Sequence, residues 1–256
     1  MTLFTDTTFI GIDPTAGQRP FVYAALNGDL RLLALGHGEI NDVLAFIAGQ
    51  RQAMVAVCSP RQPNQGLMQK PEVRDQLTPQ PRPGRWQNFR VAEYQLRQHN
   101  ISSPRTPARE ENCPNWMRMG FRLYKRLEDL GYHSFPTPEA NHQSVEVYPH
   151  ACFTVLLGQA PFHKQTIEGR IQRQLMLYEQ KIGIADPMRI FEEITRHRLL
   201  NSILPLEKLY SPGELDALVA AYTASLAVTA PEKTISLGHP DEGLVYLPAG
   251  ELRARY

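Results

Sequence analysis

Three carboxylate residues occur where hydrophobic patterning alone would not place an acid. Asp13 ends a predicted strand, Glu146 lies within another, and Asp216 lies in the first turn of a predicted helix. Carboxylate oxygens are hard ligands that favour Mg²⁺ or Mn²⁺. Two such ions about 3.5 to 4 Å apart can clamp the attacking and leaving oxygens of a phosphodiester. We therefore predict Asp13, Glu146 and Asp216 as the catalytic and metal-binding residues of a metal-dependent hydrolase, with Mg²⁺ or Mn²⁺ as cofactor.

Each of these acids also has a purely structural interpretation. Asp216 can complement the dipole of its helix, which contributes about 0.3 to 1 kcal/mol. Asp13 can begin an Asx-turn before Pro14, and Glu146 can face solvent from its strand. Their spacing along the sequence leaves both kinds of interpretation open.

The elements that must position these acids follow from the periodicity of apolar residues. Residues 8–14 are predicted as a buried strand, and two β-rich runs flank a predicted two-residue turn at Asn27-Gly28, so the chain opens with an antiparallel meander. Ser211, Pro212 and Glu214 predict the start of the last helix as N-cap, first helical residue and capping-box acid. Between them, helices are predicted at 39–49, 86–98, 115–130, 150–157, 166–180 and 187–198, and strands at 53–58 and 144–148.

This order of elements is typical of a ribonuclease-H-like α/β fold with three layers. It predicts a mixed five-stranded sheet that begins with an antiparallel meander and has helices on both faces. We expect a single domain over residues 1–256 with a loop and helix insertion at about 59–135. The segments 59–84 and 100–114 are rich in Pro, Gln and Ser, and loops of that length tend to be functional.

Six segments of the sequence support the same fold by resemblance. They are GIDPTAGQRPF (11–21), SPRQPNQGLM (59–68), VEVYPHACFTVLLG (145–158), KQTIEGRIQRQLML (164–177), DALVAAYTA (216–224) and SLGHPDEGLVYLP (236–248). Together they resemble a family of predicted ribonuclease-H-like nucleases, domain of unknown function 429, over nearly the whole chain. The resemblance implies nuclease activity and matches the family's expected metal ligands to Asp13, Glu146 and Asp216. Many members carry an Asp after the fourth strand, where this sequence has Cys58, so a four-carboxylate site is not expected.

Positive charge gathers between residues 82 and 126, where ten Lys and Arg stand against three Glu in a chain of net charge +1. Aromatic residues are interleaved with them, a composition suited to phosphate contacts and base stacking. Nucleic acid is therefore the predicted partner, and a solvated helix face is the structural alternative. The secondary candidates for contacts near the metal or with substrate are Arg90, Glu93, Arg97, Arg118, Lys164, Arg170 and Arg173.

Most of these secondary candidates rest on the resemblance. Arg90, Glu93 and Arg97 match the family's R-x-x-D-x-x-x-R segment with Glu in place of Asp, although an ordinary surface ion-pair ladder has the same spacing. Lys164, Arg170 and Arg173 match basic positions of the family and are candidates for holding phosphate oxygens, with a solvated helix face as the alternative.

Composition sets the remaining expectations. Hydrophobic residues make up 42% and charged residues 21%, as in ordinary globular proteins. Three cysteines without C-x-x-C spacing argue against a disulfide framework and a structural zinc site. With such cysteines a reducing cytoplasm is the expected location. No signal peptide or membrane span is recognised, and the sequence does not separate a monomer from a homodimer. The alternatives to a nuclease are a non-catalytic module that binds nucleic acid or protein, and the ATPase version of the same fold.

Overall fold

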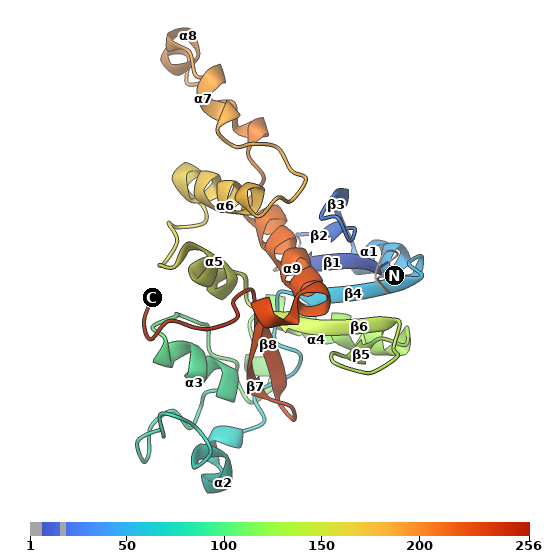
Figure 1. Ribbon diagram of the computed structural model, residues 1–256, viewed down its shortest axis with the longest axis vertical. Coiled ribbons are helices and arrows are strands. Elements are labelled where there is room, and N and C mark those ends of the chain that lie inside the picture. The colour runs from blue at the N-terminus through green and yellow to red at the C-terminus, as the bar shows by residue number, and fades with distance from the viewer. Residues whose placement is uncertain (1–6, 16–18) are drawn as a thin grey trace.

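The computed structural model describes residues 7–15 and 19–256, and within them one mixed sheet is covered by helices (Figure 1). The strands are β1 (Thr7–Asp13), β2 (Phe21–Leu26), β3 (Leu32–Gly38), β4 (Gln52–Val57), β5 (His133–Ser134), β6 (His142–Val147), β7 (Ile235–His239) and β8 (Gly243–Leu247). They are ordered β3-β2-β1-β4-β6-β8-β7, and β5 pairs with β6 beside this path. The α/β class predicted from the sequence is confirmed.

The antiparallel meander at the start of the sheet is confirmed, but its first turn differs from the prediction. β1, β2 and β3 pair antiparallel, whereas β4 is parallel to β1 and β6 is parallel to β4. The connection from β2 to β3 covers residues 27–31 in place of a two-residue turn. The Asn27 side-chain oxygen accepts hydrogen bonds from the backbone N–H groups of Asp29 and Arg31, which stabilises this longer loop.

The prediction of five strands is wrong, because residues 7–15 and 19–256 form a sheet of eight strands. β7 and β8 form an antiparallel hairpin, and β8 pairs parallel with β6. Each of these two strands has five residues. Gly238 and Gly243 have positive φ, and His239-Pro240-Asp241-Glu242 separates the two short apolar runs, so the strand pattern is weak in the sequence. β5 has only two residues and carries no recognisable strand pattern.

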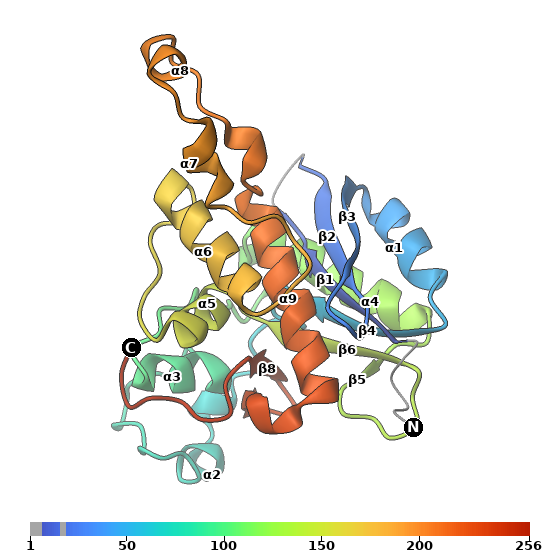
Figure 2. The same ribbon diagram turned by 45° about the horizontal axis from the view of Figure 1, so that its top comes forward.

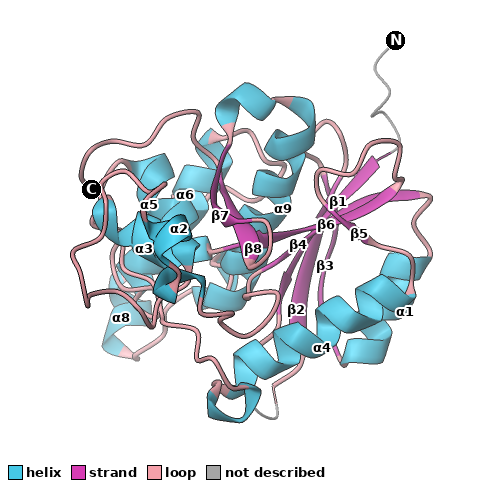
Figure 3. Cartoon of the chain, turned by 90° about the horizontal axis from the view of Figure 1, so that it is seen from below, coloured by secondary structure: helices cyan, strands magenta, loops and turns pink. Residues whose placement is uncertain are grey.

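The helices cover both faces of the sheet. They are α1 (Ile40–Ala48), α2 (Pro71–Arg74), α3 (Val91–Gln98), α4 (Asn115–Asp129), α5 (Pro149–Leu157), α6 (Ile167–Glu179), α7 (Arg189–Glu193), α8 (Arg196–Leu200) and α9 (Pro212–Thr229). α1 and α4 lie together on one side of the strands, and α9 lies on the other side (Figure 3). Within the predicted insertion at 59–135, Leu123, Tyr124 and Leu127 of α4 pack in the core with Ile10 and Val55 of the sheet.

Helix α9 crosses the sheet unusually close to β1. A Cβ atom added to Gly11 would lie 1.9 Å from the carbonyl oxygen of Ala217, so only glycine permits this approach. The predicted capping of α9 is confirmed, since the Ser211 hydroxyl accepts a hydrogen bond from the Glu214 N–H and the Glu214 carboxylate accepts one from the Ser211 N–H. The end of β1 and the first turns of α9 therefore meet at one edge of the sheet.

The segment between α6 and α9 projects from the rest of the protein, as Figure 2 shows for α7 and α8. A continuous helix at 187–198 was predicted, but the chain breaks between α7 and α8, where the Thr195 hydroxyl caps α8 by accepting a hydrogen bond from Arg198 N–H. Large apolar side chains are exposed here, including Phe191 and Leu200. Among the helices in the described ranges, none has the length and apolar character needed to cross a membrane.

Candidate active site

Two of the three predicted acids come together where β1 meets α9. Asp13 is the last residue of β1, and Asp216 is the fifth residue of α9. A Cβ atom added to Gly213, in the first turn of α9, would lie 3.3 Å from Oδ2 of Asp13, which shows how closely this carboxylate approaches the helix. The Lys164 ammonium, from the loop before α6, lies 2.7 Å from Oδ2 of Asp216. The sequence prediction for this pair of acids therefore corresponds to a real juxtaposition.

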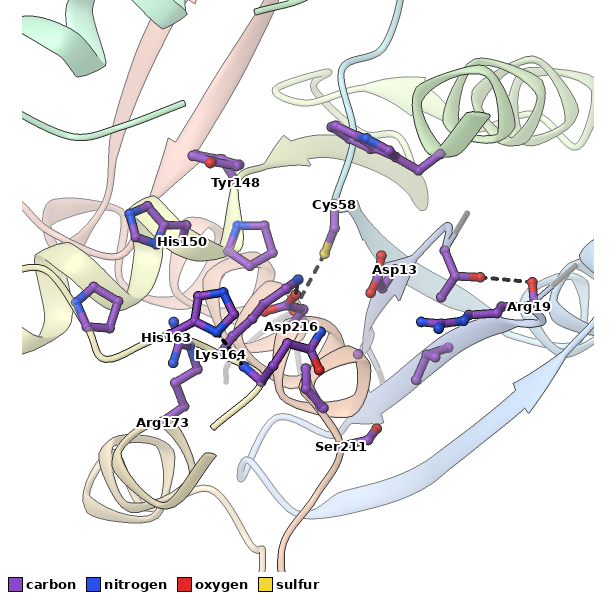
Figure 4. Close-up of a pocket in the computed structure, with 18 of the residues that line it drawn as sticks. Asp13, Arg19, Cys58, Tyr148, His150, His163, Lys164, Arg173, Ser211 and Asp216 are labelled. Atoms are coloured by element: carbon purple, nitrogen blue, oxygen red, sulfur yellow. Dashed lines mark hydrogen bonds and ion pairs between the residues drawn. The ribbon is translucent and has the colours of Figure 1, made fainter. Parts of the chain in front are cut away.

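The two acids line an open cleft of about 1120 Å³ (Figure 4). The other ionisable side chains that line it are Arg19, His37, Cys58, Tyr148, His150, His163, Lys164 and Arg173. Figure 4 shows Asp13 and Asp216 between Lys164 on one side and Arg19 on the other. The cleft thus combines a central pair of acids with flanking cations.

The electrostatics of the acid pair follow from burial and from the proximity of like charges. Burial, followed by repulsion from Asp216, raises the pKa of Asp13 to about 7, and the positive charge of Lys164 partly opposes the rise. Asp216 and Asp13 in turn raise the pKa of Lys164 above its ordinary value, against the effect of burial, so the ammonium stays charged. Additional positive charge at the pair would favour the ionised form of Asp13.

The thiol of Cys58 lies beside the acids at the end of β4. Its backbone N–H donates to the carbonyl of Ile12, and its Sγ lies 3.5 Å from the carbonyl oxygen of Asp216. Burial and the charges of Asp13 and Asp216 raise its pKa well above the usual range. The thiol therefore stays protonated, which makes it a poor nucleophile and a poor ligand for a hard cation.

Glu146 does not join this pair. In the parallel register Glu146 of β6 pairs with Val57 of β4, and Val57 pairs with Ile12 of β1. Side chains alternate between the two faces of a sheet. The Glu146 side chain therefore points to the same face as Ile12, whereas the Asp13 side chain points to the face covered by α9. Glu146 is buried, so the alternative that it faces solvent is wrong. This register is set by strand pairing, which the pattern of a single strand does not reveal.

The carboxylate of Glu146 is held by Arg90. The guanidinium donates to both oxygens, Nη1 to Oε1 at 2.6 Å and Nη2 to Oε2 at 2.8 Å, and both side chains are buried. The N–H of Arg61 also donates to Oε2. A two-pronged pair of this kind, fully enclosed, satisfies each charge with the other and ties the start of α3 to β6.

The other candidates from the segment 82–126 also have structural partners. Glu93 is buried and accepts hydrogen bonds from the N–H and hydroxyl of Thr106 and from the N–H of Arg90. Arg97 donates to the carbonyl of Ser103. Arg118 lies on the exposed face of α4 and is not among the residues lining the cleft. The structure therefore brings none of these three to the acid pair.

The basic candidates on α6 differ from one another in position. Arg170 donates to the backbone carbonyls of Tyr210 and Leu209, which holds the segment leading into α9. Arg173 lines the cleft, is buried, and donates from Nη1 to the carbonyl of Phe162, while its Nε has no partner within the described chain. Of the predicted phosphate-binding residues, Lys164 and Arg173 reach the cleft.

Four residues outside the predicted site also line the cleft, namely Arg19, Tyr148, His150 and His163. The sequence contains a signal for Tyr148 and His150, because they flank Pro149, which follows a predicted strand and is the first residue of α5. Ligand sites gather at the carboxyl ends of parallel strands, so residues beside such a strand end were candidates. Burial lowers the pKa of His150, so its neutral imidazole faces the cleft.

The fit of this site to a metal ion is limited by its ligand count. Within the described part of the chain, no group of three or more His, Cys, Asp or Glu side chains is arranged to hold a metal ion. Asp13 and Asp216 supply two carboxylates. Mg²⁺ commonly uses only one or two protein carboxylates and completes its coordination with water and substrate phosphate. The pair therefore suits one hard cation but does not by itself make the three-carboxylate site predicted from the sequence.

Comparison with known proteins gives one match. A family model described as "protein of unknown function (DUF429)" matches residues 11–242, a range that contains all three predicted acids. Neither the curated proteins nor the solved structures gave a significant match.

Proposed function

The chain belongs to the DUF429 family, and from the acid pair in its cleft we propose that it is a metal-dependent phosphodiesterase that hydrolyses nucleic acid. The observation that carries this proposal is the meeting of Asp13 and Asp216, from β1 and α9, between the cations Lys164 and Arg19. Acids that converge from separate elements in an open cleft seldom serve packing, since burying paired carboxylates is costly.

The sheet topology supports a ribonuclease-H-like assignment for this function. β1, β2 and β3 form the antiparallel meander, and β4 and β6 continue the sheet in parallel beyond β1. This part of the sheet brings the acid of the first strand to the last helix, as that fold requires. β5, β7 and β8 extend the sheet beyond the five strands of the predicted fold.

Asp13 and Asp216 are the residues that would hold a divalent cation. When bound there, Mg²⁺ or Mn²⁺ would polarise a phosphate oxygen and lower the pKa of an attacking water. The proposal involves one cation, because both oxygens of Glu146 accept hydrogen bonds from Arg90 and are turned away from the pair. Glu146 as a ligand stays a prediction, and it would require the ion pair with Arg90 to open and the carboxylate to reach the face of the sheet on which Asp13 lies.

The cleft's own side chains would bind and orient the phosphodiester. Lys164 is half-exposed and fixed beside Asp216, so its ammonium can pair with a phosphate oxygen next to the acids. Arg173 holds the loop that carries Lys164 by donating to the carbonyl of Phe162. His150 presents a neutral imidazole, which can accept a proton at a ring nitrogen.

The test is hydrolysis of labelled single- and double-stranded DNA and RNA with Mg²⁺ or Mn²⁺. Asp13→Asn and Asp216→Asn should each lower the rate of hydrolysis by roughly a hundredfold or more. Even the loss of a residue that only supports a metal ligand typically lowers metal affinity or activity by about 10- to 100-fold. The matched control is Asp29→Asn, an exposed acid in the β2–β3 loop that does not line the cleft, and it should leave the rate unchanged. Mn²⁺ titration should give one site that is lost in Asp13→Asn and retained in Glu146→Gln.

A binding module without catalysis is the second candidate, and specific contacts favour it. Lys164 already neutralises Asp216, and Cys58 stands where many relatives are expected to carry an acid. This candidate predicts nucleic-acid binding that weakens with salt and no divalent-dependent cleavage of any substrate in the panel. Cleavage that survives Asp13→Asn would reject the assignment of the site itself.

A further inference from the structure

We infer that the cleft binds an unpaired nucleobase by stacking, so that the substrate is single-stranded nucleic acid. The inference deepens the proposed function and rests on it. It is carried by the planar side chains that line the same cleft as the acid pair, which are Trp116, Tyr148, His150, Phe162 and His163.

All five rings keep exposed surface, although Tyr148 also packs against the core and its ring centroid lies 6.1 Å from that of His150. Phe162 is 57% exposed, His163 is exposed, and Trp116, Tyr148 and His150 are only half-buried. They come from three separate elements, namely the start of α4, the β6–α5 junction and the loop before α6. A single exposed ring is ordinary on a protein surface, but five that converge on one cleft form a platform for a planar ligand.

The other tryptophan of the chain is Trp86, which is half-buried like Trp116 but lies outside the cleft. Trp86 stacks edge-on with Phe89 at 4.9 Å and with Tyr94 at 5.8 Å between ring centroids, and it does not line the cleft. Trp116 packs beside Met117 and Phe121 but also faces the cleft. The two tryptophans can therefore be separated experimentally.

Charge beside the rings identifies the class of planar ligand. Lys164 and Arg19 flank the acid pair, and the unpartnered Nε of the buried Arg173 lies in a side chain that lines the same cleft. Guanidinium and ammonium groups bind phosphate oxygens. Rings for bases and cations for phosphates together are the combination used to bind single strands.

A duplex does not suit this arrangement. In a duplex each base is stacked on its neighbours and presents only its edge to a groove, so its face is not available to a protein ring. Stacking on Trp116 or Tyr148 requires a base that is out of the helical stack. The acid pair then lies beside an unpaired nucleotide, and paired substrate should bind poorly.

The experiment uses the full chain with Trp86→Phe, in which Trp116 is the sole tryptophan. Binding is measured in EDTA, without turnover, by Trp116 fluorescence during titration with an oligo-dT strand, a hairpin duplex of matched charge and an abasic strand of equal length. The oligo-dT strand should quench Trp116 to saturation, whereas the duplex and abasic strands should bind at least about tenfold more weakly.

Two variants measure the contribution of stacking. Tyr148→Leu and Trp116→Leu should each weaken binding of labelled oligo-dT by about tenfold, while the duplex affinity stays unchanged. Because Trp116 also packs against Met117, circular dichroism must show that its variant is folded, and Tyr148→Leu tests the inference independently.

Several outcomes would overturn the inference. Equal affinity for abasic and oligo-dT strands, equal quenching by the duplex, or no change in Trp116 emission would each do so. Quenching by oligo-dT without cleavage in Mg²⁺ or Mn²⁺ would reject the phosphodiesterase proposal and leave base stacking supported. Cleavage of single strands with an unresponsive Trp116 would reject base stacking alone.

Discussion

Buried carboxylates in this protein are compensated in two different ways. Glu146 has a full set of partners, since both oxygens accept hydrogen bonds from the guanidinium of Arg90. Among the described residues Asp13 has no guanidinium bound to both of its oxygens, and the charge of Lys164 acts on both Asp13 and Asp216. Removing one member of an enclosed ion pair leaves an unpaired buried charge. We therefore assign Arg90 and Glu146 a structural role. Asp13 and Asp216 are therefore the pair to which we assign the proposed cation.

Glu93 provides a prediction at the residue scale for the dependence of stability on pH. Burial raises the pKa of Glu93 to about 7 from an ordinary value of 4.5, despite its hydrogen bonds to Thr106. Between these pH values the folded state holds a proton that the unfolded state has released. The free energy of unfolding therefore falls as pH rises through this window, by on the order of 3 kcal/mol for this group.

Replacing Glu93 by Gln removes the ionisation and should remove that part of the slope. Urea unfolding at pH 5, 6, 7 and 8 should show the variant gaining stability relative to the wild type as pH rises. Glu110→Gln changes an exposed acid in the same segment. Its free energy of unfolding should depend on pH in the same way as that of the wild type. Parallel curves for Glu93→Gln and wild type would contradict the raised pKa.

At the scale of elements, the approach of α9 to β1 determines the site. Asp13 and Asp216 meet only because Gly11 allows the backbone of α9 at Ala217 to lie against the strand. The capping box at Ser211 and Glu214 fixes where the helix begins, and so fixes the turn on which Asp216 lies. Stability and site geometry thus depend on the same contact.

Gly11→Ala should therefore be costly although the change is a single methyl group. The new Cβ would overlap the Ala217 carbonyl, so α9 must shift, with an expected cost on the order of 3 kcal/mol. For a chain of this size that lowers Tm by about 6 to 12 °C in a thermal scan. The control is Gly49→Ala, where the nearest atom would lie 3.5 Å from the added Cβ and φ is −76°. An unchanged Tm for Gly11→Ala would contradict the close approach.

Sequence patterns predicted the elements that have long, regular periodicity. The antiparallel meander, α4 and the start of α9 were expected, because each has a clear apolar pattern or a capping motif, whereas the loop between β2 and β3 is longer than predicted. The hairpin of β7 and β8 was not, since its short strands are interrupted by glycines with positive φ. Asp13 and Asp216 followed from strand and helix ends, whereas the placement of Glu146 depends on inter-strand register.

For the whole molecule, the last segment of the chain is part of the sheet and of the layer around it. β8 lies between β6 and β7, and its Val245, Tyr246 and Leu247 are buried. The final residues run beside α3, where the Tyr256 N–H donates to the carbonyl of His99 (Figure 1). The family match ends at residue 242, before β8 begins, so the matched range is shorter than the structural unit.

Two truncations distinguish the contributions of β8 and of the final residues. A chain ending at residue 242 loses β8, exposes the edge of β6 and detaches β7, so it should be unfolded or aggregated on size exclusion. Each of the three buried side chains of β8 contributes about 1.5 to 3 kcal/mol to the free energy of unfolding, and their sum is a large share of the stability of a typical domain. A chain ending at residue 250 keeps β8 and loses chiefly the hydrogen bonds of Arg253 and Tyr256. It should unfold cooperatively in urea with about 1 to 3 kcal/mol less stability. If the shorter chain unfolded with the same midpoint as the longer one, β8 would not be an integral strand, and the sheet would end at β6.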